Sequence, residues 1–247
     1  MTFLGLAAFA LYFGAHFFRC VRLYILSLGQ RKGGARLVAI HCITVWPSAV
    51  IPFKMGEFLR VGGFCGAMKS PSSGVSIWLI ERFSDAVAII LLIGSASVLL
   101  TPGRDTVWTL ALAGGFIVSC GVTAWMLVEV LPFLRKDLIL RSRSKKGLIA
   151  LRLVDYVENA VGQVRTLLVG RFSLTLLIGL AIWCLELGAM AMWSFSVRGE
   201  FGLTTDFLLG LPSVMATYRI PVFALFTLIG IALLGGIVFK KWQTQHA

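Results

Sequence analysis

The sequence predicts an all-α polytopic membrane protein, a helical bundle that forms a single domain over residues 1–247. Of the 247 residues, 58% are hydrophobic and only 14% are charged, whereas soluble domains carry about 25% charged residues. The apolar residues form several continuous runs of about 20 residues, each long enough to cross hydrocarbon as a helix. Because polar residues do not alternate along these runs, membrane-spanning strands are not expected.

Seven apolar runs are the candidate membrane segments. They cover Thr2–Phe18, Leu37–Phe53, Gly74–Leu100, Val107–Leu131, Phe172–Val197, Phe207–Thr217 and Ile220–Phe239. The first run has no basic residues before it and no small-residue cleavage site after it, so we expect a retained span rather than a signal peptide.

The basic residues set the expected topology. The net charge is +12, and the Lys and Arg residues lie mostly between the runs, as in membrane proteins that keep these residues in the cytoplasm. We therefore expect no nucleic-acid partner. If all seven runs spanned the membrane, the basic stretches Arg19–Arg36 and Pro132–Arg171 would lie on opposite sides. The conflict disappears if Leu37–Phe53 is re-entrant, with Pro47 breaking its helix in the middle.

The same reasoning applies to Phe207–Thr217, which Pro212 interrupts. The sequence then predicts about five full spans plus two re-entrant Pro-broken segments, with the N-terminus outside and the C-terminus inside a bacterial cytoplasmic (inner) membrane. All but four of the 23 Lys and Arg residues become cytoplasmic, Lys54–Lys69 included. The two broken segments, WPSAVIPFK and LPSVMATYRIP, would enter from opposite faces, as in the inverted repeats of transporters.

A separate amphipathic helix is expected at residues 148–170. Its apolar residues recur at spacings of three and four. They are Leu151, Val154, Val157, Val161, Val164 and Leu168. Such a helix either lies on the cytoplasmic surface of the membrane or packs on the bundle as a linker, and the pattern fits both.

Ionisable residues inside the apolar runs mark the candidate site, because each needs a partner or a function there. Glu81 and Asp85 share one helix face, and Arg82 is close enough to Asp85 to neutralise it. Glu186 has no charged residue near it in the sequence, so it needs a partner on another element or a proton.

These residues belong to a larger near-neutral set. Its cations are Lys54, Arg60, Arg82 and Arg219, and its anions are Glu57, Glu81, Asp85 and Glu186. Two interpretations stay open: the charges lock helices together as ion pairs, or the arginines bind an anionic headgroup in bidentate fashion. We expect His41 to bond to backbone, and the five scattered cysteines to form neither a disulfide framework nor a metal site. No cofactor is expected.

Two ordered motifs resemble a known family. Residues 52–60, PFKMGEFLR, and residues 81–85, ERFSD, resemble the P-x-[KR]-x-G-E-x-x-R and E-R-x-x-D elements of the lysylphosphatidylglycerol synthase transmembrane region, or flippase-like domain. Residues 18–22, FRCVR, resemble the arginine-bearing end of an early helix there. The resemblance implies a protein that moves a phospholipid or lipid-linked intermediate between leaflets. It places Lys54, Gly56, Glu57, Arg60, Glu81, Arg82 and Asp85 in the site, and Glu186 corresponds to an acidic residue in a W-x-x-E setting of that family. Arg219 is a further candidate because it belongs to the charged set above.

The sequence also departs from that family pattern. The family has a further helix before the one that begins here at Thr2. Its C-terminal P-x-x-x-G-x-G-x-x-E element is replaced by residues 211–219, LPSVMATYR, and no aminoacyl-transferase domain is present, so synthesis of an aminoacylated lipid is not expected.

The alternative hypothesis is a non-transporting membrane subunit of a cell-envelope glycosyltransferase or polysaccharide synthesis complex. The oligomeric state stays open. An intramembrane enzyme is not expected, because H-E-x-x-H and G-x-S-x-G are missing and nothing supplies a nucleophile or metal. Without a P-loop, G-x-x-x-x-G-K-[ST], any direction of transport would come from gradients.

Overall fold

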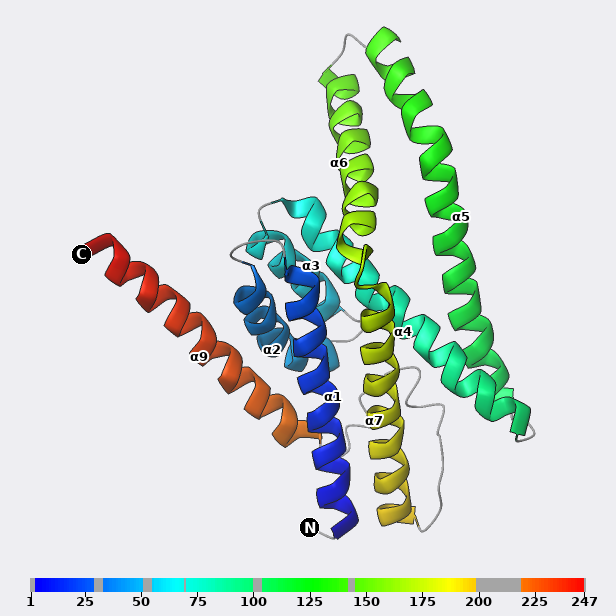
Figure 1. The fold of residues 1–247 in the computed structure, drawn as a ribbon, viewed down its shortest axis with the longest axis vertical. Helices are drawn as coiled ribbons and strands as arrows, with labels where there is room; N and C mark the ends of the chain where they lie inside the picture. The colour runs from blue at the N-terminus through cyan, green and yellow to red at the C-terminus, as the bar shows by residue number, and fades with distance from the viewer. Residues whose placement is uncertain are drawn as a thin grey trace.

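The computed structural model describes residues 3–28, 33–50, 55–68, 70–99, 104–141, 145–198 and 219–246. Within these ranges every regular element is an α-helix, which confirms the predicted all-α class (Figure 1). The helices are α1 (Phe3–Ser27), α2 (Gly34–Val50), α3 (Met55–Ala67), α4 (Pro71–Leu99), α5 (Arg104–Arg141), α6 (Lys145–Leu168), α7 (Phe172–Arg198) and α9 (Arg219–His246).

Three stretches of the described helices are long and apolar enough to cross a membrane. They are Phe3–Ser27, Phe172–Ser196 and Arg219–Lys240. A shorter apolar stretch, Leu110–Thr123, lies in α5. These stretches indicate an α-helical membrane protein.

Helix α1 lies at the centre of the bundle, against α7, α2 and α9 (Figure 1). Its predicted end at Phe18 is wrong, because the helix continues to Ser27. Leu23 and Leu26 are fully buried, so the apolar residues after Arg22 extend the buried surface of the helix. Arg171, in the α6–α7 turn, donates to the carbonyl oxygens of Ile25 and Leu28 at the end of α1, which satisfies acceptors that a helix end leaves unpaired.

The predicted break at Pro47 is also wrong, since α2 runs through Pro47 to Val50. The chain instead returns along α3, a helix that was not predicted. The contact is close at Gly56: a Cβ atom there would lie 2.4 Å from Ser48 Cα. Because no side chain fits between the two backbones, glycine at position 56 allows α3 to fold back against α2.

Helices α4, α5 and α6 form the other side of the molecule (Figure 1). Helix α5 passes the predicted end of its run at Leu131 and continues through Pro132 to Arg141. The predicted amphipathic helix is confirmed as α6. Its Val154 and Ala160 are buried while Arg152 is exposed, and Ser76 of α4 donates to the Ala160 carbonyl oxygen at 2.9 Å. These contacts show α6 packed on the bundle, which is one of its two expected placements.

The two chain ends lie apart from each other. In Figure 1 the N-terminus is at the bottom, whereas the C-terminus is on the left at about mid-height. Helix α9 packs against α2 and α1. The second predicted broken segment, Phe207–Thr217, and Lys54 lie outside the described residues.

Candidate functional site

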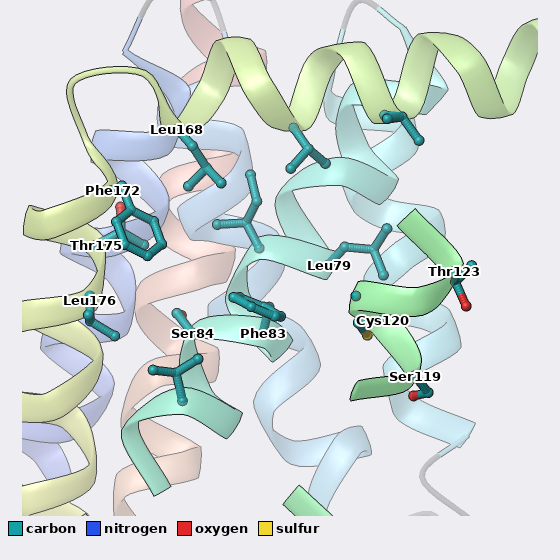
Figure 2. A pocket seen from close by; sticks show the side chains of 15 residues that line it. Leu79, Phe83, Ser84, Ser119, Cys120, Thr123, Leu168, Phe172, Thr175 and Leu176 are labelled. Carbon is teal, nitrogen blue, oxygen red and sulfur yellow. The ribbon is translucent and has the colours of Figure 1, made fainter. Parts of the chain in front are cut away.

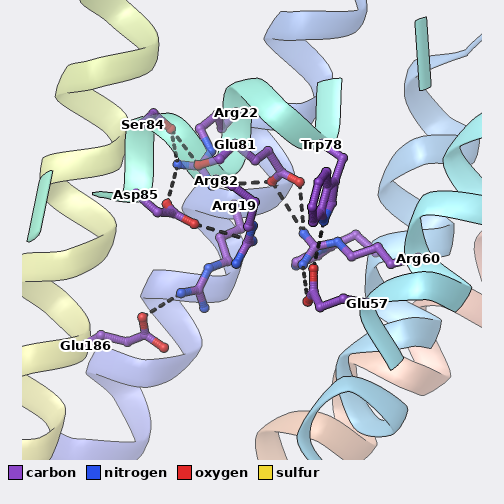
Figure 3. A network of polar contacts seen from close by, with 11 residues as sticks. Arg19, Arg22, Glu57, Arg60, Trp78, Glu81, Arg82, Ser84, Asp85 and Glu186 are labelled. Atoms are coloured by element: carbon purple, nitrogen blue, oxygen red, sulfur yellow. Dashed lines mark hydrogen bonds and ion pairs between the residues drawn. The ribbon is translucent and has the colours of Figure 1, made fainter. Parts of the chain in front are cut away.

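Charged side chains from four helices meet in the interior of the bundle. This charge cluster comprises Arg19 and Arg22 from α1, Glu57 and Arg60 from α3, Glu81, Arg82 and Asp85 from α4, and Glu186 from α7. Figure 3 shows these side chains pointing toward one another from their separate helices. Four of them are cations and four are anions, so the cluster is formally neutral.

Helix α4 supplies the central face of the cluster. Trp78, Glu81 and Asp85 are spaced by three and four residues, which places them on one side of a helix. Ser84 adds a hydroxyl that donates to the Glu81 carbonyl oxygen at 3.0 Å. The arrangement confirms the sequence-based inference that Glu81 and Asp85 share a face.

Glu81 joins three helices. Its carboxylate accepts a hydrogen bond from Arg22 Nη2 at 3.3 Å and from Arg60 Nη2 at 3.2 Å. Glu81 and Arg22 are both fully buried. Since water cannot solvate this carboxylate, the two guanidinium groups supply the compensating charge.

Asp85 is held from both sides. Arg22 Nη1 donates to its Oδ1 at 2.8 Å, and Arg82 Nη2 lies 3.3 Å from its Oδ2. The second contact confirms the prediction that Arg82 pairs with Asp85. With 30% of its side chain exposed, Arg82 is also the most open charge of the cluster.

Glu57 closes the α3 side of the cluster. Trp78 Nε1 donates to its Oε2 at 2.9 Å, and Arg60 Nη1 lies 3.5 Å from its Oε1. Its side chain is 20% exposed, so Glu57 and Arg82 form the accessible edge of an otherwise buried group.

Glu186 finds its partner on another element, as the sequence predicted. Arg19 Nη2 donates to its Oε2 at 2.5 Å, which joins α7 to α1. Arg19 and Arg22 were not among the predicted site residues, because both were placed in a cytoplasmic loop. The sequence did contain a signal for them. The apolar residues Leu23 to Leu26 follow both arginines and extend the helix beyond Phe18, so Arg19 and Arg22 lie within it.

Two buried histidines lie beside the cluster. Arg60 Nη2 donates to His41 Nδ1, so the expectation that His41 bonds to backbone is wrong. The His16 ring lies 5.9 Å from the His41 ring, centroid to centroid. Neither nitrogen of His16 has a hydrogen-bond partner, although the residue is buried against Tyr12, Phe223 and Phe226.

The remaining predicted site residues lie apart from the ion pairs. The Arg219 guanidinium lies over the Tyr12 ring, 5.1 Å from its centroid, a cation–π arrangement. Gly56 allows the close approach of α3 to α2. Lys54, outside the described residues, has no assigned position.

An apolar cavity lies next to the charge cluster, among α4, α5, α6 and α7. Its volume is about 490 Å³, within the range of small-molecule sites. Figure 2 shows Leu79, Phe83 and Ser84 of α4 facing Phe172, Thr175 and Leu176 of α7 across it. Ser84 belongs to both features, because its Oγ also accepts a hydrogen bond from Arg22 Nη1 at 2.9 Å.

Compared with known proteins, the chain matches no protein-family model, and neither a curated protein nor a solved structure is significantly similar to it. Among the described residues, no group of three His, Cys, Asp or Glu side chains is arranged to hold a metal ion. The function is therefore argued from the charge cluster and the cavity.

Proposed function

We propose that the chain is a flippase-like integral membrane protein that translocates a phospholipid or lipid-linked intermediate between leaflets, or assists that translocation. The observation that carries the proposal is a neutral cluster of eight charges inside an apolar bundle. Charged groups are costly in a membrane protein interior and by default mark a substrate or ion path. The resemblance of residues 52–60 and 81–85 to the flippase-like domain points the same way.

A translocator must let a lipid headgroup reach its charged residues, and in this proposal the headgroup binds at the accessible edge of the cluster. An anionic headgroup, as in a phospholipid or a polyprenyl-phosphate-linked intermediate, approaches Arg82 and replaces Asp85 as its partner. Guanidinium groups bind phosphate in bidentate fashion, and Arg60 and Arg22 lie behind Arg82 as further cations. Glu57, Glu81 and Asp85 hold these arginines in place when no headgroup is bound.

The membrane arrangement in this proposal has about five spans, with α2 and α3 as the first re-entrant pair and residues 207–217 as the second. The N-terminus lies outside and the C-terminus inside the cytoplasmic membrane of a bacterium. The exposed basic residues of α5 and α6, such as Arg135 and Arg152, support this orientation, because Lys and Arg residues are retained on the cytoplasmic side.

The second candidate is a non-transporting membrane subunit of an envelope glycosyltransferase or polysaccharide synthesis complex. One observation favours it: all four carboxylates of the cluster already have guanidinium partners. A network of that kind can hold α1, α3, α4 and α7 together without any substrate, and the partner would then be an envelope-synthesis enzyme.

Leaflet exchange of labelled lipids in liposomes separates the two candidates. The purified parent protein is compared with Arg82→Gln and Glu81→Gln. Arg82 lies at the accessible edge of the cluster, and Glu81 joins three of its helices. Arg165→Gln, on the exposed side of α6, is the matched control. We expect exchange by the parent and the control, and strongly reduced exchange by the two cluster variants at equal folded protein.

No exchange of phospholipid or polyprenyl phosphate by the folded parent would refute the translocator. If the cluster variants then also lower protein abundance, while Arg165→Gln does not, the charges serve the fold and the subunit candidate is favoured.

A further inference from the structure

We propose that the cavity among α4, α5, α6 and α7 holds one acyl chain of a phospholipid whose headgroup lies at the charge cluster. The inference rests on the proposed function and names its substrate class. It begins with the cavity wall, which is formed mainly by aliphatic and aromatic side chains such as Leu79, Ile80, Val87, Leu168 and Leu176. Such a wall favours a hydrocarbon ligand, since burial of a polar one would leave its hydrogen bonds unmade.

The size of the cavity fits a single chain. A hydrocarbon chain of about 16 carbons fills roughly 450 Å³ when close-packed, and the cavity measures about 490 Å³. A polyprenyl chain with several times as many carbons would leave most of its length outside. The volume therefore favours the acyl chain of a phospholipid.

The position of Ser84 joins the two ends of such a ligand. Its side chain lines the cavity and also bonds to Arg22 of the charge cluster. The cavity and the charge cluster are therefore adjacent, and in this proposal the phosphate lies beside the cluster, whose most accessible cation is Arg82. The apolar tail and the anionic head then contact adjacent parts of one site.

The test is photo-crosslinking in phosphatidylglycerol vesicles that contain a fraction of lipid with a diazirine in its acyl chain. Crosslinked peptides of the full chain are mapped by mass spectrometry. For the parent we expect crosslinks concentrated on the cavity-lining residues of α4, α6 and α7, rather than spread over all lipid-facing helices.

Two glycines of α5 provide a matched pair of variants. A Cβ atom at Gly121, in the cavity wall, meets no atom within 4 Å, and the same holds at Gly115, outside the wall. Gly121→Phe should lower the crosslink yield on α4 and α7 at least tenfold, because the ring takes up the space of about four methylene groups. Gly115→Phe should leave the yield unchanged.

Evenly spread crosslinks, or equal yields in the two glycine variants, would overturn the inference. Displacement of the probe by polyprenyl phosphate, but not by phosphatidylglycerol, would replace the acyl chain with a polyprenyl chain.

Leaflet exchange measured in the same vesicles keeps the two proposals distinguishable. Cavity-specific crosslinks without exchange would leave the acyl site standing and refute translocation. Exchange with evenly spread crosslinks would do the reverse.

Discussion

At the residue scale, Arg22 illustrates how the charge cluster is stabilised. Its guanidinium bonds to Glu81 and Asp85 as well as to Ser84, and no part of its side chain is exposed. Because water cannot reach this guanidinium, only its carboxylate partners compensate its positive charge. Removal of either charge type therefore leaves an unpaired buried ion, which is more destabilising than removal of both.

We predict that Arg22→Leu lowers the free energy of unfolding by about 3–5 kcal/mol, the loss typical of a broken buried ion pair. The double variant Arg22→Leu/Asp85→Asn should recover part of this loss, because it removes a charge of each sign. Thermal unfolding of the detergent-solubilised protein measures both effects.

Arg82→Leu is the control for this comparison, since Arg82 is partly exposed and should be replaced at smaller loss. Equal melting temperatures for the parent and Arg22→Leu, or a double variant less stable than the single, would contradict the role assigned to this arginine.

The sequence predicted the part of the site that depends on local spacing. Glu81, Arg82 and Asp85 lie within one helical turn and Glu57 and Arg60 within another, so their pairing follows from helix geometry. Arg19 and Arg22 were missed because basic residues after an apolar run usually mark its cytoplasmic end. Their partners are on α4 and α7, and such tertiary contacts leave no mark in local spacing.

At the scale of elements, glycines set how closely some helices approach. Helix α9 lies so close to α2 that a Cβ atom at Gly230 would be 2.8 Å from the Ala39 carbonyl oxygen. At Gly235, further along the same helix, a Cβ atom would meet nothing within 4 Å. The two positions therefore separate the effect of packing from the effect of helix propensity.

We predict that Gly230→Ala lowers the melting temperature, because the new methyl group clashes with α2 backbone and overpacking costs about 1–3 kcal/mol. Gly235→Ala should preserve or raise it, since alanine favours a helix by about 1 kcal/mol over glycine. Parallel thermal unfolding of the two variants is the measurement, and an equal response would show that the α2–α9 contact does not limit stability.

The elements were predicted best where an apolar run is long and contains no proline, as for α4 and α7. Near Pro47 the prediction failed, because the helix tolerates the lost backbone hydrogen bond and continues to Val50. Helix α3 was missed since its sequence, with Glu57 and Arg60 among glycines, reads as a polar segment. Its burial depends on Phe64, which is fully enclosed by neighbouring helices.

At the scale of the whole molecule, the proposed topology places specific residues on opposite sides of the membrane. If α2 and α3 return to the side they entered from, Lys146 and Gln243 lie on one side and Phe3 on the other. If α2 crosses the membrane completely, the chain makes one more crossing before Lys146. Phe3 and Lys146 then lie on the same side, provided that the other spans are unchanged.

We predict that Lys146→Cys and Gln243→Cys, each in a chain whose native cysteines are replaced by serine, react with a membrane-impermeant maleimide only after the cells are opened. Phe3→Cys should react in intact spheroplasts. Labelling of Lys146→Cys in intact spheroplasts would contradict the re-entrant pair and the proposed orientation.

The ion pairs of α1 also impose an order on biogenesis. The carboxylates that pair with Arg22 are encoded 59 and 63 residues later, and the partner of Arg19 follows after 167 residues. As the ribosome releases the chain from its N-terminus, α1 emerges with two cations long before their counterions exist. Stable burial of the first helix therefore waits for α7, and the insertion machinery must shelter α1 until most of the protein has been synthesised.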